Sequence, residues 1–388
     1  MSKWNMVKLG SINNYQSKSI NPMKEPNRKF ELYSVPSYEY NYPEILTGAE
    51  IGSTKQTVQE GDILLCKINP RINRVWYVMK HTKYPLIASS EWIVIRNNDI
   101  FSDYLVWCLR SSPFRNLLET NVTGIGGSLT RVQPKQVKEY LIPLPPFETQ
   151  KQIAKTLDTA AELLAMRKQQ LAELDNLIKS TFYDVFGDPV INEKGWKVKK
   201  LAELIVDVKN GITRRGRADL KGSIVLKLKD IRENYIDFSD VNKFTLNQTE
   251  RDLFQVTYNQ LLFVRVNGNP NYVGRCAVFT GFDQRIFYND HIMRVTIKEE
   301  IINPTFLSCL LNFPYGKKEI KNHLKTSAGQ YTINQQGLSN IVAPLPPLSL
   351  QTQFAAIVTK IEEQKTLLKK AINETQTLFE SLMSEYFE

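Results

Sequence analysis

The chain has few of the residues from which metal centres and disulfide frameworks are built. Its 388 residues include only four cysteines and three histidines. No two cysteines form a Cys-x-x-Cys pair, and the histidines have no metal-ligand spacing. We therefore expect no bound metal or cofactor, cysteines that belong to the core, and histidines that are structural or on the surface. These residues are Cys66, Cys108, Cys276, Cys309, His81, His291 and His323.

Long hydrophobic runs are also absent. No stretch reaches the roughly 18 consecutive apolar residues that a membrane-spanning helix needs. The first residues, Met1 to Trp4, have no hydrophobic signal core. The sequence therefore predicts a cytoplasmic protein with no membrane span.

Catalytic motifs are missing as well. There is no phosphate-binding loop with its lysine, no Gly-x-Gly after a strand, and no spaced set of acids typical of a metal nuclease. The segment Asn312 to Tyr315 resembles the Asn-Pro-Pro-Tyr signature of adenine methyltransferases, but it has Phe313 in second place and its repeat counterpart begins with Ser111. We interpret this segment as structural and expect a non-catalytic chain. A fused enzyme with diverged methyltransferase motifs is an alternative.

What the sequence does contain is a duplicated signature. The segment Pro143 to Pro146 reads Pro-Leu-Pro-Pro, and the same four residues return 201 positions later at Pro344 to Pro347. Gln150 and Gln351 follow at the same distance, and each begins a long amphipathic pattern. A repeat of this length indicates a duplicated domain with its helix rather than a solenoid of small units.

Both amphipathic patterns have apolar residues at alternating steps of four and three, which is typical of a coiled-coil seam. At about 1.5 Å per residue, some 37 residues would form a rod of roughly 55 Å. We expect the two helices to pack as an antiparallel coiled coil. The seam positions are Ile153, Leu157, Ala160, Leu164, Arg167, Leu171, Leu174 and Ile178 in the first pattern and Ile357, Ile361, Gln364, Leu368, Ala371, Thr375, Leu378 and Leu382 in the second; of these, Leu157, Leu164, Leu171, Ile361, Leu368 and Leu378 are candidate partner-binding residues.

The positive charge lies outside these helices. The formal net charge is +10, but residues 148–186 contain five Lys/Arg against six Asp/Glu, and residues 349–388 contain four against six. The two stretches before the helices therefore carry +13. Basic domains joined to near-neutral helices suggest that the domains contact a polyanion and the helices contact protein.

The sequences of the two stretches that precede the long helices can be aligned with each other. Residues 63–68 match 261–266 as apolar strands, 92–95 match 292–295, and 104–110 match 305–311 as short helices. The polar segments 123–130 and 326–332 are predicted to be loops. Because strand and helix signals do not alternate regularly, we assign an α+β fold with a pseudo-twofold internal repeat. The predicted parts are 1–143 (first globular domain), 144–189 (first long helix, ended by Gly187 and Pro189), 190–343 (second globular domain) and 344–388 (second long helix).

Arginine and asparagine are concentrated after the first matched strand in each copy. Arg can bind guanine and Asn can bind adenine with two hydrogen bonds each in the major groove of DNA. Other arginines near glycines are candidates for phosphate contacts, which hold register without reading sequence. The candidate DNA-binding residues are Lys67, Asn69, Arg71, Asn73, Arg74 and Arg131 in the first copy and Arg214, Arg215, Arg217, Arg265, Asn267, Asn269, Tyr272, Arg275 and Gln330 in the second.

The duplicated Leu-Pro-Pro signature with its glutamine and helix resembles the specificity subunits of type I restriction-modification systems. The resemblance rests on residues 144–153, 182–189, 345–347 and Gln351, and on the half-chain repeat. It departs from the family at Thr149 and Leu350, where the family commonly has Glu before the glutamine. The resemblance implies a two-domain DNA reader without an active site, in which each domain reads half of a split target in double-stranded DNA and the helices set the spacer. Two methyltransferase (modification) subunits would dock on it, and restriction subunits would join them. The rival interpretation is a coiled-coil scaffold of a DNA-associated complex that reads no sequence.

Overall fold

The computed structural model describes residues 4–120, 122–123, 130–213, 219, 221–327 and 329–388. The chain forms two compact units, each closed by segments that are distant in sequence. Unit 1 contains Met1–Gln169 and Lys370–Glu388, and unit 2 contains Gln170–Lys369. Within the described ranges, no helix is both long and apolar enough to cross a membrane.

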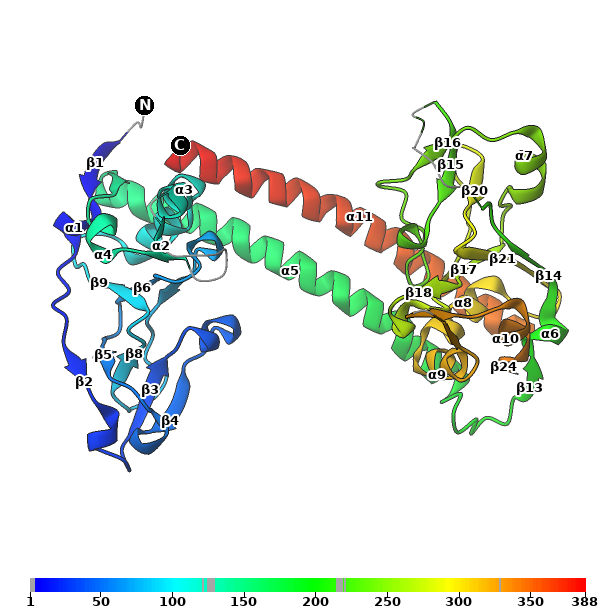
Figure 1. Ribbon diagram of the computed structural model, residues 1–388, viewed down its shortest axis with the longest axis horizontal. Helices are drawn as coiled ribbons and strands as arrows, with labels where there is room; N and C mark the ends of the chain where they lie inside the picture. Colours follow the sequence, from blue (N-terminus) through cyan, green and yellow to red (C-terminus); the bar gives the residue numbers. More distant parts are fainter. Residues whose placement is uncertain (1–3, 121, 124–129, 214–218, 220, 328) are drawn as a thin grey trace. The chain divides into compact units, whose positions relative to one another are not determined.

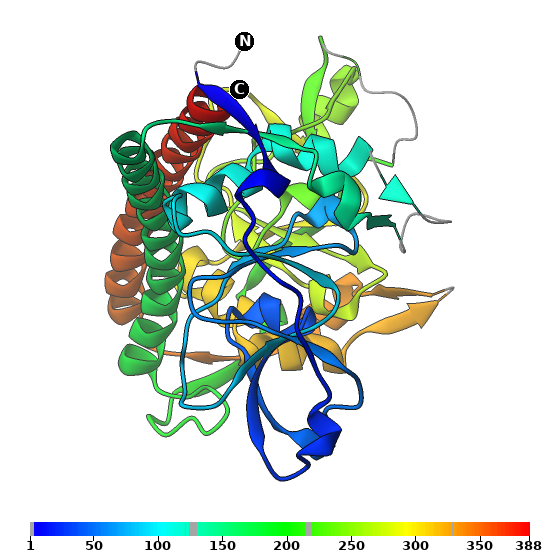
Figure 2. The same cartoon turned by 90° about the vertical axis from the view of Figure 1, so that its left-hand side faces the viewer.

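Unit 1 contains a five-stranded sheet and a three-stranded sheet (Figure 2). The five-stranded sheet has the order β2-β5-β8-β3-β4, in which β3 and β8 are parallel, and the three-stranded sheet has the order β7-β6-β9. A further antiparallel pair joins β1, the first strand of the unit, to β12, the strand that directly precedes the first long helix. The strands are β1 (Asn5–Lys8), β2 (Ser19–Ile20), β3 (Lys29–Tyr33), β4 (Glu44–Thr47), β5 (Lys55–Thr57), β6 (Ile63–Cys66), β7 (Val75–Tyr77), β8 (Leu86–Ala88), β9 (Trp92–Ile95), β10 (Val122–Thr123), β11 (Arg131–Val132) and β12 (Leu141–Leu144).

Unit 2 repeats this plan. Its parallel pair is β15 with β20, its central strand β17 lies between β19 and β21, and β13 pairs with β24. The strands are β13 (Lys197–Lys200), β14 (Ile205–Asn210), β15 (Ser223–Leu226), β16 (Lys243–Phe244), β17 (Leu261–Val264), β18 (Val266–Asn267), β19 (Cys276–Val278), β20 (Ile286–Tyr288), β21 (Ile292–Ile297), β22 (Lys325–Ser327), β23 (Gln330–Thr332) and β24 (Val342–Leu345).

The short helices also correspond between the units. An adjacent helix pair, α2 with α3 in unit 1 and α8 with α9 in unit 2, supplies buried residues to the main core of its unit (Figure 1). The helices are α1 (Leu9–Ile12), α2 (Ser102–Arg110), α3 (Ser112–Thr120), α4 (Pro134–Val137), α6 (Leu201–Leu204), α7 (Gln248–Phe254), α8 (Pro304–Asn312), α9 (Pro314–Asn322) and α10 (Gln335–Asn340), with 3-10 turns η1 (Pro22–Lys24), η2 (Pro36–Tyr40), η3 (Gly48–Glu50), η4 (Pro70–Ile72), η5 (Leu228–Asp230) and η6 (Pro270–Tyr272). The shared order of elements confirms the prediction of a duplicated α+β domain. We call residues 4–144 lobe 1 and residues 196–345 lobe 2.

The proline-rich signature joins each lobe to its long helix. Pro143 lies in β12, which pairs with β1 in a two-stranded sheet among the described residues, so the missing N–H of the proline costs no central hydrogen bond. The helices begin slightly earlier than the sequence predicted, because the last proline can precede the first helical turn: α5 is Phe147–Phe186 and α11 is Leu348–Phe387. Gly187 follows α5 in the left-handed region at φ 75°, as its place after the helix predicted.

A buried glutamine fixes the start of each long helix. In unit 1, Oε1 of Gln150 accepts a hydrogen bond from the backbone N–H of Phe101 at 2.9 Å, and its Nε2 donates to the carbonyl of Pro145 at 2.9 Å. In unit 2, Gln351 accepts from Asn303 at 2.8 Å and donates to Pro346 at 2.7 Å. Because Phe101 and Asn303 immediately precede α2 and α8, the glutamine ties the long helix to the short helix of its own lobe.

Inside each unit, the start of one long helix lies beside the end of the other. In unit 1, Ile153 and Leu157 of α5 share a core with Phe387 of α11. In unit 2, the ring of Phe354 at the start of α11 lies 5.6 Å from that of Phe182 near the end of α5. The two helices therefore run in opposite directions within each unit.

Polar side chains also connect the two long helices within each unit. In unit 1, Nη1 of Arg167 donates to the carbonyl of Ala371 at 2.7 Å and to the hydroxyl of Thr375. In unit 2, Lys365 forms ion pairs of 2.7 Å with Asp175 of α5 and with Glu362 of its own helix. Neither polar group has a matching residue at its repeat position, so the two ends of the helix pair differ chemically.

The predicted seam is correct for most positions but wrong at Ile357, Gln364 and Leu378, whose side chains are exposed. Val358 is buried in place of its neighbour Ile357. Leu157, Leu164 and Ile361 are buried, and Leu171 and Leu368 are half-buried. Leu378 is 54% exposed, and its neighbour Phe379 packs against Trp107 with ring centroids 5.5 Å apart. The apolar stripe has shifted by one residue here because the end of α11 packs against the aromatic face of α2 as well as against α5.

A second correction concerns the polar segment 326–332, which the sequence predicted to be a loop. Its described residues form a hairpin of β22 and β23, with Ser327 opposite Gln330, and β23 also pairs with β18. Its counterpart at 123–130 is described only at its ends. Backbone pairing with β18 gives the segment a strand structure that its polar composition does not favour.

The four cysteines are free and buried, as predicted. Cys108 and Cys309 occupy equivalent positions on α2 and α8. Burial raises the pKa of the Cys108 and Cys276 thiols to about 12. These thiols are therefore neutral core groups at physiological pH.

Candidate nucleic-acid interface

The cationic segment of lobe 1 is a tight turn between β6 and β7. Its centre is η4, which begins at Pro70, and Asn69 and Asn73 flank it in the left-handed region at φ 48° and 47°. Asparagine tolerates this conformation better than other residues with a Cβ atom. The turn leaves Arg71 exposed at its tip and Lys67 half-buried at its base.

Two candidate residues of this turn have structural partners. The side-chain amide of Asn73 donates to the carbonyl of Leu109 at 2.9 Å, which attaches the turn to the end of α2. Arg74 forms an ion pair of 3.3 Å with Glu39, and its side chain is only 13% exposed. These contacts leave Lys67, Asn69 and Arg71 as the residues of the turn best placed to meet a ligand.

The structure brings Arg131 to the same place. Ile68 and Arg131 form an isolated β-bridge, and the N–H of Asn69 donates to the carbonyl of Thr130 at 2.9 Å. The Arg131 side chain lies 3.2 Å from the carboxylate of Glu91, which directly precedes β9. The base of the β6–β7 turn therefore gathers cations from two segments that are more than 60 residues apart in sequence.

Lobe 2 has the corresponding turn between β17 and β19. The side-chain oxygen of Asn267 accepts from the N–H of Asn269 at 2.9 Å, and that of Asn269 accepts from Asn271 at 3.0 Å. These amide oxygens stabilise the turn, which includes η6. The exposed Gln330 is near this turn because β23 pairs with β18 and places Tyr331 opposite Asn267.

Arg265 and Arg275 point to different places. Nη1 of Arg265 donates to the carbonyl of Asp290 at 3.0 Å, next to β21. Arg275 lies over the ring of Tyr272 at 4.3 Å and reaches the carbonyl of Ile231 at 3.5 Å. It lines a cavity of about 650 Å³ together with Lys317, which is paired with Glu233. The side chain of Arg275 therefore points away from that of Arg265, although its backbone pairs with Val264 at the base of the turn.

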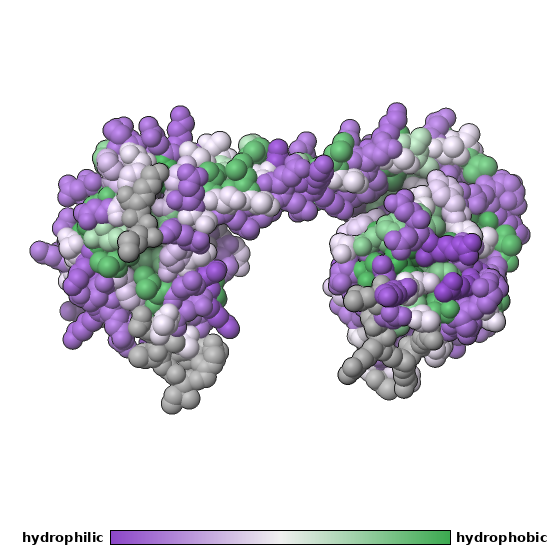
Figure 3. Space-filling view, turned by 90° about the horizontal axis from the view of Figure 1, so that it is seen from above, coloured by the Kyte–Doolittle hydropathy of each residue, from purple (hydrophilic) through white to green (hydrophobic). Residues whose placement is uncertain are grey.

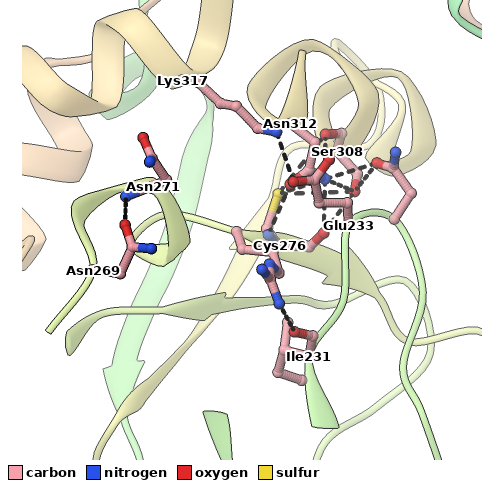
Figure 4. A network of polar contacts seen from close by, with 10 residues as sticks. Ile231, Glu233, Asn269, Asn271, Cys276, Ser308, Asn312 and Lys317 are labelled. Carbon is pink, nitrogen blue, oxygen red and sulfur yellow. Dashed lines mark hydrogen bonds and ion pairs between the residues drawn. The ribbon is translucent and has the colours of Figure 1, made fainter. Parts of the chain in front are cut away.

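The methyltransferase-like segment is part of the fold. Asn312 is 2% exposed, and its Nδ2 donates to the carbonyl of Cys276 and to the side-chain oxygen of Asn234, each at 2.8 Å (Figure 4). Its Oδ1 accepts from the N–H of Cys276 at 3.2 Å. This side chain is fully used in joining α8 to β19, which supports the structural interpretation of the segment.

Three candidates, Arg214, Arg215 and Arg217, lie outside the described residues. Within the described part of the chain, no cluster of His, Cys, Asp and Glu could hold a metal ion. Sequence reasoning did not select Glu91 or His291, although both lie beside the cationic turns. Both could have been identified from the sequence, because each directly precedes a strand that the repeat matches, at Trp92 and at Ile292.

Known proteins resemble this chain over most of its length. A family model described as the type I restriction modification DNA specificity domain matches residues 1–176 and 193–376. The type I restriction enzyme StySPI specificity subunit of Salmonella potsdam is 26% identical over 294 residues, 73% of this chain and 63% of that protein. The EcoKI specificity subunit of Escherichia coli K12 is 23% identical over 306 residues, 74% and 65% respectively. The aligned region thus spans less than two thirds of the length of these two relatives.

A third relative and two solved structures match over nearly the full length. The MjaVIII specificity subunit of Methanocaldococcus jannaschii is 24% identical over 399 residues, 98% of this chain and 91% of that protein. The S subunit of a type I restriction-modification system from M. genitalium covers 100% of this chain and 96% of its own, with a TM-score of 0.62 and 14% identity. A chain from a structure of type I R-M complex assembly and conformational transition has a TM-score of 0.58 and 19% identity, covering 99% and 97%. These structures share the fold, and the family model matches both halves, so the chain belongs to the family of type I restriction modification DNA specificity domains.

Proposed function

We propose that this chain is the DNA sequence-specificity subunit of a type I restriction-modification complex. The proposed target is bipartite, and each lobe reads one half of it in double-stranded DNA. The proposed recognition domains are residues 1–143 and 190–343, and residues 144–189 and 344–388 contain the helices that separate them.

The observation that carries this proposal is the repetition of a cationic turn on the same backbone frame. In lobe 1 the N–H of Cys66 donates to the carbonyl of Arg74 at 3.0 Å, and in lobe 2 the N–H of Val264 donates to that of Arg275 at 2.9 Å. Each turn follows an interior strand of a sheet and presents cationic and amide side chains, which can contact phosphates and bind base edges. One duplex can be contacted by two such turns if they meet its major groove at separate places.

The two long helices are proposed to form an antiparallel coiled coil that acts as a spacer. Each has 40 residues, which corresponds to about 60 Å at about 1.5 Å per residue. The opposite directions of α5 and α11 within each unit, and the contacts of Arg167 and Lys365, support this arrangement. A fixed register between the helices would fix the gap between the two half-sites.

The exposed apolar residues of the helices are proposed to help dock two modification subunits, which restriction subunits would then join. Met166 and Leu367 are 59% and 69% exposed, and Leu177 and Leu378 are 47% and 54% exposed. The members of each pair are 201 residues apart, so the repeat offers the same kind of apolar surface twice. Figure 3 shows hydrophobic patches between hydrophilic residues along these helices. Burying such residues is a common source of affinity between proteins.

We propose that the chain itself is non-catalytic and that methylation and cleavage belong to its partners. The saturated hydrogen bonding of Asn312 supports this, because a catalytic amide must be available to a substrate. The rival function, a scaffold that reads no sequence, accounts for the helices but not for the duplicated turns.

Expression of the chain with its modification subunits, followed by genome-wide mapping of methylated adenines, tests this function. We expect one bipartite motif. Replacing residues 1–143 with those of another family member should change one half of the motif and leave the other half and the gap unchanged. Methylation without a motif, or a change in both halves, would contradict the proposal.

A further inference from the structure

The base of the cationic turn is built from three chain segments in each lobe, and the first two are joined in the same way. In lobe 1, β6 and β9 are antiparallel with Cys66 opposite Trp92, so the next pair is Lys67 and Glu91. The N–H of Lys67 donates to the carbonyl of Glu91 at 2.9 Å. Opposed residues of antiparallel strands are close neighbours on one face.

Lobe 2 has the same pairing with other residues. Val264 of β17 lies opposite Ile292 of β21, so the next pair is Arg265 and His291. The N–H of Arg265 donates to the carbonyl of His291 at 2.9 Å, the same distance as in lobe 1. Glu91 and His291 therefore occupy equivalent positions.

The third segment is also equivalent. The N–H of Val132 donates to the carbonyl of Lys67 at 3.0 Å, and the N–H of Ile333 donates to that of Arg265 at 3.0 Å. The residues before these, Arg131 and Thr332, pair with Ile68 and Val266 respectively. We call each set of three side chains a junction: Lys67, Glu91 and Arg131 in lobe 1, and Arg265, His291 and Thr332 in lobe 2.

The two junctions share a backbone but differ in hydrogen-bonding chemistry. In lobe 1, Oε1 of Glu91 accepts from Arg131 at 3.2 Å, whereas Oε2 is buried and is without a hydrogen-bond partner among the described residues. An ionised carboxylate can only accept hydrogen bonds. In lobe 2 the same position has the imidazole of His291, which is 45% exposed, and its backbone partner Arg265 donates from its guanidinium to the carbonyl of Asp290. The equivalent place thus offers an acceptor in one lobe and donors in the other.

A carboxylate at this position needs an explanation if the lobe binds DNA. DNA phosphates repel the Glu91 carboxylate, and this repulsion weakens binding to every sequence alike. Arg131 neutralises the charge of the carboxylate but does not explain why a carboxylate is there. A carboxylate that faces the exocyclic amino group of cytosine or adenine gains a hydrogen bond, whereas one that faces the carbonyl oxygen of guanine or thymine meets another acceptor. Because the Glu91 side chain is 27% exposed, rotation of its carboxylate can turn Oε2 from its buried position toward a base edge, where it discriminates between bases.

We propose that Glu91 and His291 are specificity-determining residues of the two lobes. Glu91 selects cytosine, whose major-groove edge has an exocyclic amino group without the N7 acceptor that adenine places beside its own amino group. His291, together with Arg265, selects a base with acceptors at that edge, which is guanine. This inference rests on the proposed function, because it assigns base readout within the half-sites that each lobe is proposed to read.

The test is a selection from randomised duplex DNA with the full chain assembled with its modification subunits. In Glu91→Gln the amide keeps the size of the side chain but can also donate, so the preference at one base pair of one half-site should fall about tenfold or more. His291→Asn should have the corresponding effect in the other half-site. Glu139→Gln and His81→Asn are matched controls, because both side chains are exposed and lie outside the junctions.

Each outcome is decisive. If Glu91→Gln selects the wild-type motif, or if it and Arg131→Ala weaken binding to all sequences equally, Glu91 only positions Arg131 and the inference is wrong. Should Glu91→Gln fail to fold, the double variant Glu91→Gln/Arg131→Gln removes both charges of the pair, and the same change of motif is expected. If the wild-type complex selects no bipartite motif, the proposed function itself has failed.

Discussion

Lys365 of α11 lies 2.7 Å from Asp175 of α5 although its own side chain is only 6% exposed. The ammonium group is thus buried between two carboxylates, since Glu362 is also at 2.7 Å. Burial favours the neutral amine, but hydrogen bonds to Asp175 and Glu362 outweigh it and raise the pKa of Lys365. A buried polar group of this kind can specify how two helices align.

Replacing Lys365 with Met should therefore destabilise unit 2. The change removes the pairing of two carboxylates, and we expect a loss of about 1–3 kcal/mol. Asp175→Asn should cost less, about 1 kcal/mol or below, because Asp175 is 62% exposed and Lys365 keeps Glu362. Denaturant unfolding of the three proteins measures both values. Equal losses for the two variants would contradict a buried lysine held mainly by its own helix.

The same ion pairs predict a pH dependence. Because the pKa of Lys365 is raised on folding, its contribution is complete below the unfolded lysine pKa of about 10.4 and is lost as pH rises past the folded value. Between pH 7 and pH 9 the difference in stability between wild type and Lys365→Met should be constant, and above about pH 10.4 it should shrink. A difference that disappears already near neutral pH would contradict this assignment.

Gln150 and Gln351 are predicted to be stability residues of their own units. Each is almost completely buried, and the Ala variant leaves a backbone N–H before α2 or α8 and a proline carbonyl without their partner. The expected loss is about 1–3 kcal/mol for each glutamine. Gln152→Ala and Gln353→Ala are matched controls, since both side chains are exposed in the first turns of the same helices. Losses of the same size in the controls would argue against the anchoring role.

Arg71 at the tip of the β6–β7 turn is predicted to contact a DNA phosphate. The slope of log affinity against log salt concentration should decrease by about 1 in Arg71→Ala, with binding weakened similarly for all sequences. Lys370→Ala is the matched control, because Lys370 carries the same charge on α11 and its side chain is 76% exposed. An unchanged slope in Arg71→Ala, or an equal change in Lys370→Ala, would remove Arg71 from the interface.

Much of the fold followed from local patterns in the sequence. The four-and-three spacing predicted the long helices, and the apolar runs at Ile63 and Trp92 predicted β6 and β9. The spacing of apolar residues along the chain is sufficient to identify these elements. The hairpin of β22 and β23 could not be predicted, since its polar residues form strands only through pairing with β18. Leu378 fits the seam period, but contact with Trp107 of α2 selects Phe379 instead.

The candidate site was less predictable than the fold. The arginines and asparagines were found by their concentration in the sequence. That concentration does not show which of these side chains are already engaged in hydrogen bonds within the fold. Asn73 is bound to Leu109, and Asn269 stabilises its own turn, whereas Glu91 was missed because an acidic residue does not suggest DNA binding. The match of 92–95 with 292–295 makes Glu91 and His291 equivalent in sequence, but only the strand pairing shows that they lie opposite Lys67 and Arg265.

The spacer role makes a quantitative prediction about the target. Deleting seven residues, about two turns, from the middle of α5 and the seven facing residues from α11 shortens the helix pair by about 10.5 Å and keeps the phase of both apolar stripes. With base pairs about 3.4 Å apart, the unspecified gap should become about three base pairs shorter while both half-sites stay the same. Methylation mapping with the modification subunits measures all three parts of the motif. Deleting seven residues from α5 alone is the control, because it leaves the helices unmatched in length and should abolish methylation at a defined gap. Changed half-sites with an unchanged gap would mean that the helices do not set the spacing.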